Sequence, residues 1–415
     1  MSPKNPGARL AVDGGEPVRR KAFPRWPVYD EREERQLMEV LHSGEWGALK
    51  GSKTAEFQAR FAAYQGARFG ICVPNGTLAL EVALSAVGVG PGDEVVTTPY
   101  TFVATANSAI SVGAVPVFAD IDLDSYNIDP AEVEKAITPR TKAIMPVHMG
   151  GRPADLDALR EIAARRGVRL VEDACQAWGS EWQGRRVGAI GEIGAFSFQS
   201  SKNITAGEGG IIVTNDETLA EAAWSLHNVG RVRGGLWYYH EIVGRNLRIT
   251  EWQSAVLLAQ LERLDEQTER REANAAYLSE CLSQIPGLRP LGHDPRVTRQ
   301  SRHVTIVRYD ASAFGGRPRD EFLAALVAEG IEPVAPGYVP LNRVPAIRRA
   351  LAATGEADAR GLGRAADGLP ELPACPRAEW ASGNTIWLFQ YALLGDRSDM
   401  DDIAEACAKI QHAWE

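Results

Sequence analysis

The chain has few cysteines, no long apolar run and no basic run, and each of these absences argues against a class of protein. Lysine is also scarce. The five cysteines are widely spaced without a Cys-x-x-Cys pair, which argues against a disulfide framework or a zinc site and favours reduced thiols in the cytoplasm. No run of about 18 apolar residues is present and the N-terminal residues hold no signal-peptide core, so we expect neither membrane insertion nor export. With a formal net charge of -9 and no basic run, nucleic acid is not an expected partner.

The length and composition predict a soluble protein of enzyme size. With 415 residues, 45% of them apolar, the chain can bury a large core and should form two domains or one large domain with a lobe. We predict an N-terminal arm over residues 1–29, ordered only where the aromatic residues at 23–27 dock. A large domain should follow over residues 30–265, and a smaller C-terminal α+β domain over residues 266–415.

Between residues 70 and 175, short apolar β runs alternate with helical patterns. Strands are expected at 71–74, 94–98, 115–119, 143–147 and 168–173, and helices at 77–87, 102–112, 130–137 and 154–166. This alternation predicts an α/β fold with a mainly parallel sheet covered by helices on both faces, and ligands at the carboxyl ends of the strands. Later in the chain we expect one long helix from Thr250 to Gln284 and a mobile surface segment from Thr354 to Gly368.

One lysine stands out because lysine is scarce. The chain has eight lysines, and Lys202 is the sole lysine between Lys142 and Lys409. It lies where the predicted apolar strand around Phe196 and Phe198 runs into a polar turn, before the glycine-rich Gly207-Glu-Gly-Gly. Arginine stays protonated, whereas a partly desolvated lysine can lose its proton and form a Schiff base with an aldehyde. The alternative is an ordinary solvated lysine.

Asn75-Gly76-Thr77 forms a tight turn between a predicted strand and a predicted helix. N–H groups at a helix start, a glycine that permits close approach and a hydroxyl together make a cradle for an anion such as phosphate. Ser197, just upstream of the lysine, is a further candidate phosphate ligand. The same Asn-Gly-Thr turn is also an ordinary helix N-cap.

Three more residues follow the ends of predicted strands. Asp173 ends a buried strand, where a carboxylate needs a partner such as a pyridinium nitrogen, and Gln176 could bond a ring substituent. Phe102 could stack on a planar heterocycle. Individually, Asp173 could be a helix cap and Phe102 a core residue, but with the cradle and the lysine they form the set that holds a phosphorylated pyridine aldehyde.

The sequence resembles the pyridoxal-phosphate-dependent sugar and aminocyclitol aminotransferases of the DegT/DnrJ family, within the aspartate-aminotransferase fold type I. The resemblance extends from about Trp26 to the C-terminus. Its motifs here are Asn75-Gly-Thr-Leu-Ala-Leu, Tyr100-Thr-Phe-Val-Ala-Thr, Pro146-Val-His-Met-Gly-Gly, Glu172-Asp-Ala-Cys-Gln, Phe196-Ser-Phe-Gln-Ser-Ser-Lys-Asn, Gly207-Glu-Gly-Gly and Gly244-Arg-Asn-Leu-Arg.

The resemblance implies a role for each of these residues. Lys202 would hold pyridoxal 5'-phosphate as a Schiff base and then move a proton, and Asp173 would pair with the pyridine nitrogen. Gln176 would contact the ring hydroxyl, Phe102 would stack on the ring, and Gly76, Thr77 and Ser197 would bind the phosphate. Asn246 would reach the phosphate of a neighbouring subunit, which makes a homodimer with shared active sites the expected unit. Pro74 and Gln199 depart from the residues usual beside these motifs and could alter the shape of the pocket.

For function we expect transfer of an amino group from glutamine or glutamate to a keto group of a sugar or cyclitol, in the biosynthesis of a secondary metabolite or a surface sugar. Arg231, Arg233, Tyr239 and Tyr338 are candidates for substrate contact, with a plain surface loop as the alternative. The competing functions are an aromatising dehydratase like 3-amino-5-hydroxybenzoate synthase and a non-catalytic cofactor-binding regulator. In related dehydratases a histidine replaces the lysine, so Lys202 favours transamination. A nicotinamide dehydrogenase is disfavoured, because the glycine cluster at 88–92 lacks the Gly-x-Gly-x-x-Gly spacing.

Overall fold

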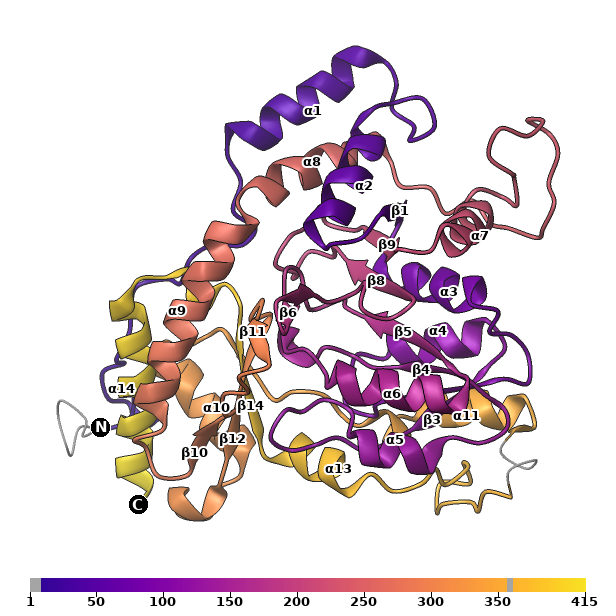
Figure 1. Ribbon diagram of the computed structural model, residues 1–415. Coiled ribbons are helices and arrows are strands. Elements are labelled where there is room, and N and C mark those ends of the chain that lie inside the picture. Colours follow the sequence, from indigo (N-terminus) through magenta and orange to yellow (C-terminus); the bar gives the residue numbers. More distant parts are fainter. Residues whose placement is uncertain (1–8, 357–360) are drawn as a thin grey trace.

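A seven-stranded sheet forms the centre of the computed structural model, which describes residues 9–356 and 361–415 (Figure 1). Its strands, in spatial order, are β1 (Phe69–Val73), β9 (Gly210–Thr214), β8 (Ile193–Ser197), β5 (Arg169–Asp173), β4 (Thr141–Met145), β2 (Glu94–Thr97) and β3 (Val115–Phe118). β9 runs antiparallel to both of its neighbours, and the other neighbouring pairs from β8 to β3 are parallel. The prediction of a mainly parallel sheet is confirmed.

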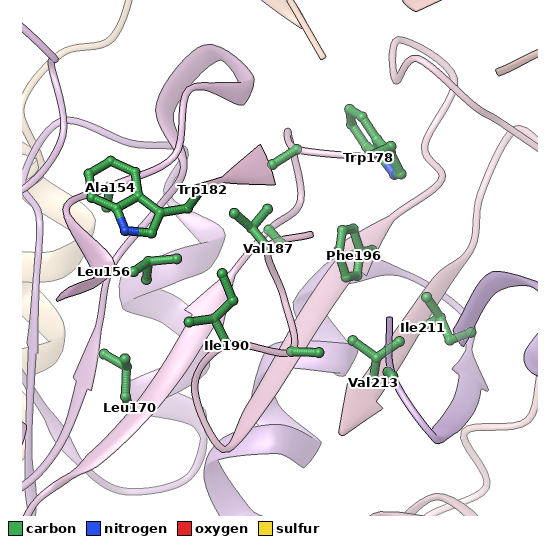
Figure 2. Close-up of a cluster of buried hydrophobic side chains, with 14 of the residues drawn as sticks. Ala154, Leu156, Leu170, Trp178, Trp182, Val187, Ile190, Phe196, Ile211 and Val213 are labelled. Atoms are coloured by element: carbon green, nitrogen blue, oxygen red, sulfur yellow. The ribbon is translucent and has the colours of Figure 1, made fainter. Parts of the chain in front are cut away.

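Helices cover both faces of this sheet. Because successive strand residues point to opposite faces, Phe196, Ile211 and Val213 join one apolar cluster while Ala195 and Ile212 join another. The first cluster packs under α2 (Lys53–Tyr64), α5 (Pro130–Ala136), α6 (Leu156–Arg166) and α8 (Glu251–Glu262); Figure 2 shows part of it. The second packs under α3 (Gly76–Ala86), α4 (Ala104–Ser111) and α7 (Glu217–His227).

A second, smaller sheet follows later in the chain and is antiparallel. Its order is β10 (Leu288–Pro290), β12 (Val304–Tyr309), β14 (Thr385–Phe389) and β13 (Val334–Ala335). It shares a core with α9 (Leu264–Leu282), α10 (Arg319–Ala328) and α14 (Arg397–Trp414). A small ribbon is made by β6 (Glu181–Trp182), β7 (Arg185–Arg186) and β11 (Val297–Arg299). The expected smaller α+β unit is present, and its boundary near residue 266 stays a prediction.

Part of the chain beyond the second sheet's first strands returns to the large sheet. Leu341, Ile347 and Leu351 pack against Ala106 and Val115, the last of which lies on the edge strand β3. Leu341 belongs to η4 (Leu341–Arg343), and Ile347 and Leu351 belong to α11 (Pro345–Ala353). The start of α13 (Pro376–Gly383) is also fixed here, because its backbone N–H groups donate to the Asp120 carboxylate at 2.9 and 3.0 Å. Segments distant in sequence therefore enclose the edge at which the strands end.

The single long helix predicted from Thr250 to Gln284 is wrong, because α8 ends at Glu262 and α9 begins at Leu264. Arg263 lies between them with φ of -103° and ψ of 0°. Its guanidinium donates to the Glu33 carboxylate of α1 (Glu31–Ser43), with Nη2 to Oε2 at 3.0 Å, and to the carbonyl of Val28 at 3.2 Å. The break is therefore associated with a long-range contact rather than with a glycine or proline in the helix.

The N-terminal arm is anchored more widely than predicted. Arg19 pairs with Asp399 and Asp402 of α14 at 2.8 Å each. The buried carboxylate of Glu329 accepts bonds from the backbone N–H groups of Ala11 and Val18 at 2.8 and 3.0 Å. Docking is thus not confined to the aromatic residues at 23–27. Residues 1–8 of the arm, and residues 357–360 of the predicted surface segment from Thr354 to Gly368, lie outside the described residues.

Candidate active site

A cavity of about 640 Å³ lies at the carboxyl edge of the parallel strands and is closed on its far side by the second sheet. Seven of the eight predicted cofactor residues line it: Gly76, Thr77, Phe102, Asp173, Gln176, Ser197 and Lys202. They come together because β1, β2, β5 and β8 end at this edge, and each is followed by a turn that carries one or more of them. The roles of these residues stay predictions.

The start of α3 forms one wall of the cavity. Asn75 caps the helix, with its Oδ1 accepting a bond from the Leu78 N–H at 2.9 Å, so the N-cap is present and the anion cradle stays a prediction. A Cβ added to Gly76 would lie 2.7 Å from the Cβ of Ser197 and 3.0 Å from the Sγ of Cys175. Glycine therefore lets the end of β8 approach the helix N-terminus, where backbone N–H groups and the Ser197 hydroxyl face one space.

Asp173 is a buried carboxylate held by hydrogen bonds. It is 4% exposed, and its Oδ2 accepts a bond from Thr105 Oγ1 at 2.8 Å while Oδ1 accepts one from the Cys175 N–H at 3.2 Å. Thr101 supports this arrangement, since its hydroxyl lies 3.0 Å from that of Thr105. Within residues 9–356 and 361–415, Asp173 forms no salt bridge, so a cationic ring nitrogen would supply the charge partner that a buried carboxylate needs.

Lys202 is half-buried in the turn that follows β8. Burial lowers the pKa of its ammonium group, and the nearby Cys175 and Asp173 oppose that shift. The Nζ lies 5.9 Å from the ring centroid of Trp178. Trp26 of the N-terminal arm holds the turn through an indole N–H bond to the carbonyl of Ser200 at 2.9 Å. A lysine with a lowered pKa is more often neutral, which both an amine nucleophile and a general base require.

Gln176 and Phe102 line the same cavity with different degrees of freedom. Gln176 is fixed, because its Oε1 accepts the Gly150 N–H at 2.8 Å and its Nε2 donates to the hydroxyl of Tyr338 at 3.3 Å. Phe102 is 56% exposed, and its ring centroid lies 6.5 Å from that of Tyr338. An open aromatic face of this kind can stack on a planar ring.

The other candidates named from the sequence divide between cavity and surface. Tyr338 lines the cavity, but Arg231, Arg233 and Tyr239 do not. The two arginines pack on other groups, Arg231 over the ring of Trp237 at 4.0 Å and Arg233 against Glu221 at 2.7 Å. These three residues therefore lie outside the cavity of their own chain, and their part in substrate contact stays a prediction.

Asn246 lies outside the cavity formed by its own chain. It is exposed and pairs through its backbone with Asn228 in an isolated bridge. The expected contact with a neighbouring subunit's phosphate stays a prediction.

Sequence reasoning missed the part of the site that the second sheet supplies. His303, Val304, Trp387 and Phe389 line the cavity, and each lies at least 100 residues after Lys202 in the chain. Cys175 and Thr105 also line it. Thr105 lies within the quoted motif Tyr100-Thr-Phe-Val-Ala-Thr and Cys175 within Glu172-Asp-Ala-Cys-Gln, and these motifs were the available signals. No local pattern marks His303, because its position depends on how the two sheets pack.

The described residues offer neither a cluster of metal ligands nor a membrane-spanning helix. No group of three or more histidine, cysteine, aspartate or glutamate side chains within residues 9–356 and 361–415 is placed to hold a metal ion. No described helix combines the length and apolarity needed to cross a membrane.

The fold and the site define an α/β enzyme whose cavity is lined by one lysine, Lys202, and by the buried carboxylate of Asp173. Residues 27–363 match the DegT/DnrJ/EryC1/StrS aminotransferase family, and the chain belongs to this family of pyridoxal-phosphate-dependent enzymes.

The chain is similar to L-glutamine:2-deoxy-scyllo-inosose aminotransferase of Streptoalloteichus tenebrarius, with 41% identity over 97% of both chains. It is 40% identical to 3-amino-5-hydroxybenzoate synthase of Amycolatopsis mediterranei, over 93% of this chain and 96% of the other. Among solved structures, 3-amino-5-hydroxybenzoic acid synthase superposes with a TM-score of 0.84 at 37% identity, covering 94% of this chain and 98% of that one. The expected fold type is confirmed.

Proposed function

We propose that this protein transfers the amino group of L-glutamine to the keto group of a cyclitol, using pyridoxal 5'-phosphate. The observation that carries the proposal is one cavity onto which Lys202, Asp173 and the N-terminus of α3 all open. A relative of 41% identity is named for glutamine and 2-deoxy-scyllo-inosose, which supports this donor and this class of ketone. Amination of a keto-sugar is the broader form of the same proposal.

The residues present fit the cofactor. The N-terminus of α3 at Gly76 and Thr77, together with the Ser197 hydroxyl, would hold the phosphate. Asp173 would pair with the ring nitrogen, a role supported by its burial and its lack of an ion pair within the described residues. Gln176 would face the ring hydroxyl and Phe102 would stack on the ring. When bound, the cofactor supplies an electrophilic aldehyde and an electron sink for transamination.

The protein's own contribution is to place and move protons. Lys202 would bind the cofactor covalently and, once released, carry a proton between the substrate carbon and its own Nζ. A free lysine has a pKa near 10.4 and would be almost wholly protonated at neutral pH. The lowered pKa of Lys202 increases the neutral fraction that can accept the proton. The bonds from Thr105 and Cys175 hold the Asp173 carboxylate in one orientation, in which it would pair with the ring nitrogen of the bound cofactor.

We further propose a homodimer with shared active sites that works in the cytoplasm. An exposed loop over residues 231–243 carries apolar side chains in solvent, with Leu236 81% and Val243 96% exposed, and Asn246 lies just beyond it. A patch of this kind is typical of an interface. All five cysteines are free, which supports a reducing compartment. Analytical ultracentrifugation tests the dimer, and a purely monomeric active enzyme would exclude it.

The test of function combines spectra with product analysis. The protein is supplied with pyridoxal phosphate, its visible absorption is recorded, and glutamine and then 2-deoxy-scyllo-inosose are added. We expect a visible band that glutamine bleaches and the ketone restores, an amino-cyclitol product, and no such band in Lys202→Ala.

The competing functions give different results. Repeating the reaction with glutamate in place of glutamine shows which of the two amino acids donates the amino group. An ultraviolet-absorbing aromatic product formed from an amino-dehydroshikimate without any donor would favour the synthase alternative. A visible band unaffected by every donor would favour a regulator.

A further inference from the structure

His303 brings an imidazole to the cavity from the second sheet. It directly precedes β12, and its backbone is fixed on both sides. Its N–H donates to the carbonyl of Gly150 at 3.0 Å, and its carbonyl accepts the N–H of Gln390 at 3.2 Å. The ring packs edge-on against Trp178 with centroids 5.6 Å apart, the same ring that Lys202 Nζ approaches. His303 therefore has a fixed place beside the lysine.

A neighbouring amide decides which ring nitrogen carries the hydrogen. Asn203 Nδ2 donates to the carbonyl of Ser301 at 2.6 Å, and since a carbonyl only accepts, the amide cannot be turned round. Asn203 Oδ1, which also only accepts, lies 3.1 Å from His303 Nδ1. Nδ1 must therefore carry a hydrogen. In the neutral ring Nε2 is then an unprotonated acceptor.

The surroundings keep this imidazole neutral. Burial lowers the pKa of His303 well below its ordinary value, and the charges of Lys202 and Arg271 lower it further. No carboxylate in residues 9–356 and 361–415 pairs with the ring. Nε2 has no hydrogen-bond partner among those residues and is not one of the fully buried unsatisfied atoms, and His303 lines the cavity. The cavity thus contains a neutral acceptor of fixed tautomer.

We propose that Nε2 of His303 accepts a hydrogen bond from a ring hydroxyl of the keto-cyclitol and thereby determines substrate specificity. The inference rests on the proposed function and adds how the ketone is recognised. A hydroxyl can donate to Nε2, whereas a hydrogen or fluorine atom in its place cannot. A carboxylate or a second carbonyl in place of the hydroxyl would bring an acceptor against Nε2, which is itself an acceptor, and no hydrogen bond could form. A site with a fixed acceptor therefore selects a neutral polyol over a deoxygenated or oxidised ring.

The first experiment is a cycle between enzyme and substrate. Wild type and His303→Phe, which keeps an aromatic ring but no acceptor, are compared with 2-deoxy-scyllo-inosose and with analogues in which each ring hydroxyl in turn is replaced by fluorine. For one position we expect fluorine to lower kcat/KM of wild type roughly 10- to 100-fold. The same replacement should cost His303→Phe less than about threefold, because the partner is gone.

Two controls show that any loss comes from the missing acceptor. His303→Gln offers an oxygen near the position of Nε2 and should regain part of the dependence on the hydroxyl. Only variants that still form the visible band and respond to glutamine are compared, so that misfolded protein is left out. Equal fluorine effects in wild type and His303→Phe at every position would overturn the inference.

The second experiment changes the protonation state of the imidazole without substituting His303. Asn203→Asp places a carboxylate against Nδ1 and raises the pKa of the imidazole, while Lys202 and Arg271 still oppose the charged form. Below the raised pKa Nε2 becomes a donor, so kcat/KM for the parent ketone should fall as pH decreases and recover above it. The pH profile of wild type should lack this decrease in kcat/KM at low pH. A variant profile identical to the wild-type profile would contradict the proposal.

A readout independent of turnover comes from ¹⁵N-histidine labelling. His303→Gln assigns the signal, which in wild type should show hydrogen on Nδ1 and none on Nε2. A signal with hydrogen on Nε2 would overturn the inference. If wild type does not aminate the parent ketone, the proposed function is wrong and this inference falls with it. If wild type aminates it but shows no dependence on His303, the inference alone is wrong.

Discussion

Gly76→Ala should separate the two halves of the phosphate cradle. The new Cβ would lie 2.7 Å from Ser197 Cβ and 3.0 Å from Cys175 Sγ, whereas ordinary contacts begin at 3.4 Å. The end of β8 and the start of α3 must therefore move apart by 3.4 − 2.7 = 0.7 Å at the closer contact. Ser197 belongs to a buried strand paired on both sides, so it cannot move without straining the sheet.

The expected magnitude follows from overpacking. Forcing atoms into a well-packed region costs about 1–3 kcal/mol. Because the phosphate needs the close approach that the new Cβ prevents, the bound state bears this cost, and pyridoxal phosphate binding should weaken roughly 5- to 150-fold. Titration of cofactor-free protein, followed by visible absorption, gives the Kd. Gly90→Ala is the matched control, because a Cβ there has no neighbour within 4 Å. Thermal melting of both cofactor-free variants separates a local cradle defect from general instability. Equal Kd values for Gly76→Ala and Gly90→Ala would refute the reasoning.

Two other predictions concern a buried hydrogen bond and a buried imidazole. Thr105→Val removes the 2.8 Å hydrogen bond to Asp173 with little change in side-chain shape. Since a hydrogen bond to a charged group is worth about 1.5–3 kcal/mol, we expect kcat to fall at least roughly tenfold. Thr105→Ser keeps the hydroxyl and should restore kcat. If Thr105→Val turns over as fast as wild type, the bond does not support the reaction. Burial lowers the pKa of His227 from 6.5 to about 4, so between these values the unfolded chain binds the extra proton and stability is lost as pH falls. A pKa difference of 2.5 units at 1.36 kcal/mol each limits the loss of unfolding free energy to about 3 kcal/mol. Urea unfolding at pH 7 and pH 5 should therefore show a smaller decrease in unfolding free energy for His227→Gln than for wild type. Equal decreases in the two proteins would contradict this assignment.

The β/α alternation of the large sheet and the residues near the carboxyl ends of its strands were predictable because both depend on local sequence. Each β run is short and bounded by turn residues, and a parallel sheet brings the carboxyl ends of its strands to one edge. Asp173 is the last residue of its strand and Thr77, Phe102 and Lys202 follow such ends, so recognising the strands was enough to group them.

The errors have a different origin. Nothing between Thr250 and Gln284 is a glycine or proline, yet the helix breaks at Arg263, whose side chain bonds to Glu33 more than 200 residues earlier. The arm is likewise fixed by Asp399 and Asp402, near the other end of the chain. Contacts at such separations leave no periodic signal in the sequence.

The sequence by itself determined the α/β alternation, the single central lysine and the strand-end residues, because propensity, turn chemistry and strand direction act over a few residues. The tertiary structure alone decided that Trp387 and His303 line the cavity and that, of the four candidate substrate contacts, Tyr338 lines it while Arg231, Arg233 and Tyr239 do not. These outcomes depend on how the second sheet packs on the first, and that packing arises from many weak contacts between distant segments. The position of the lysine at a strand end was therefore predictable, whereas the part of the cavity wall that the second sheet supplies was not.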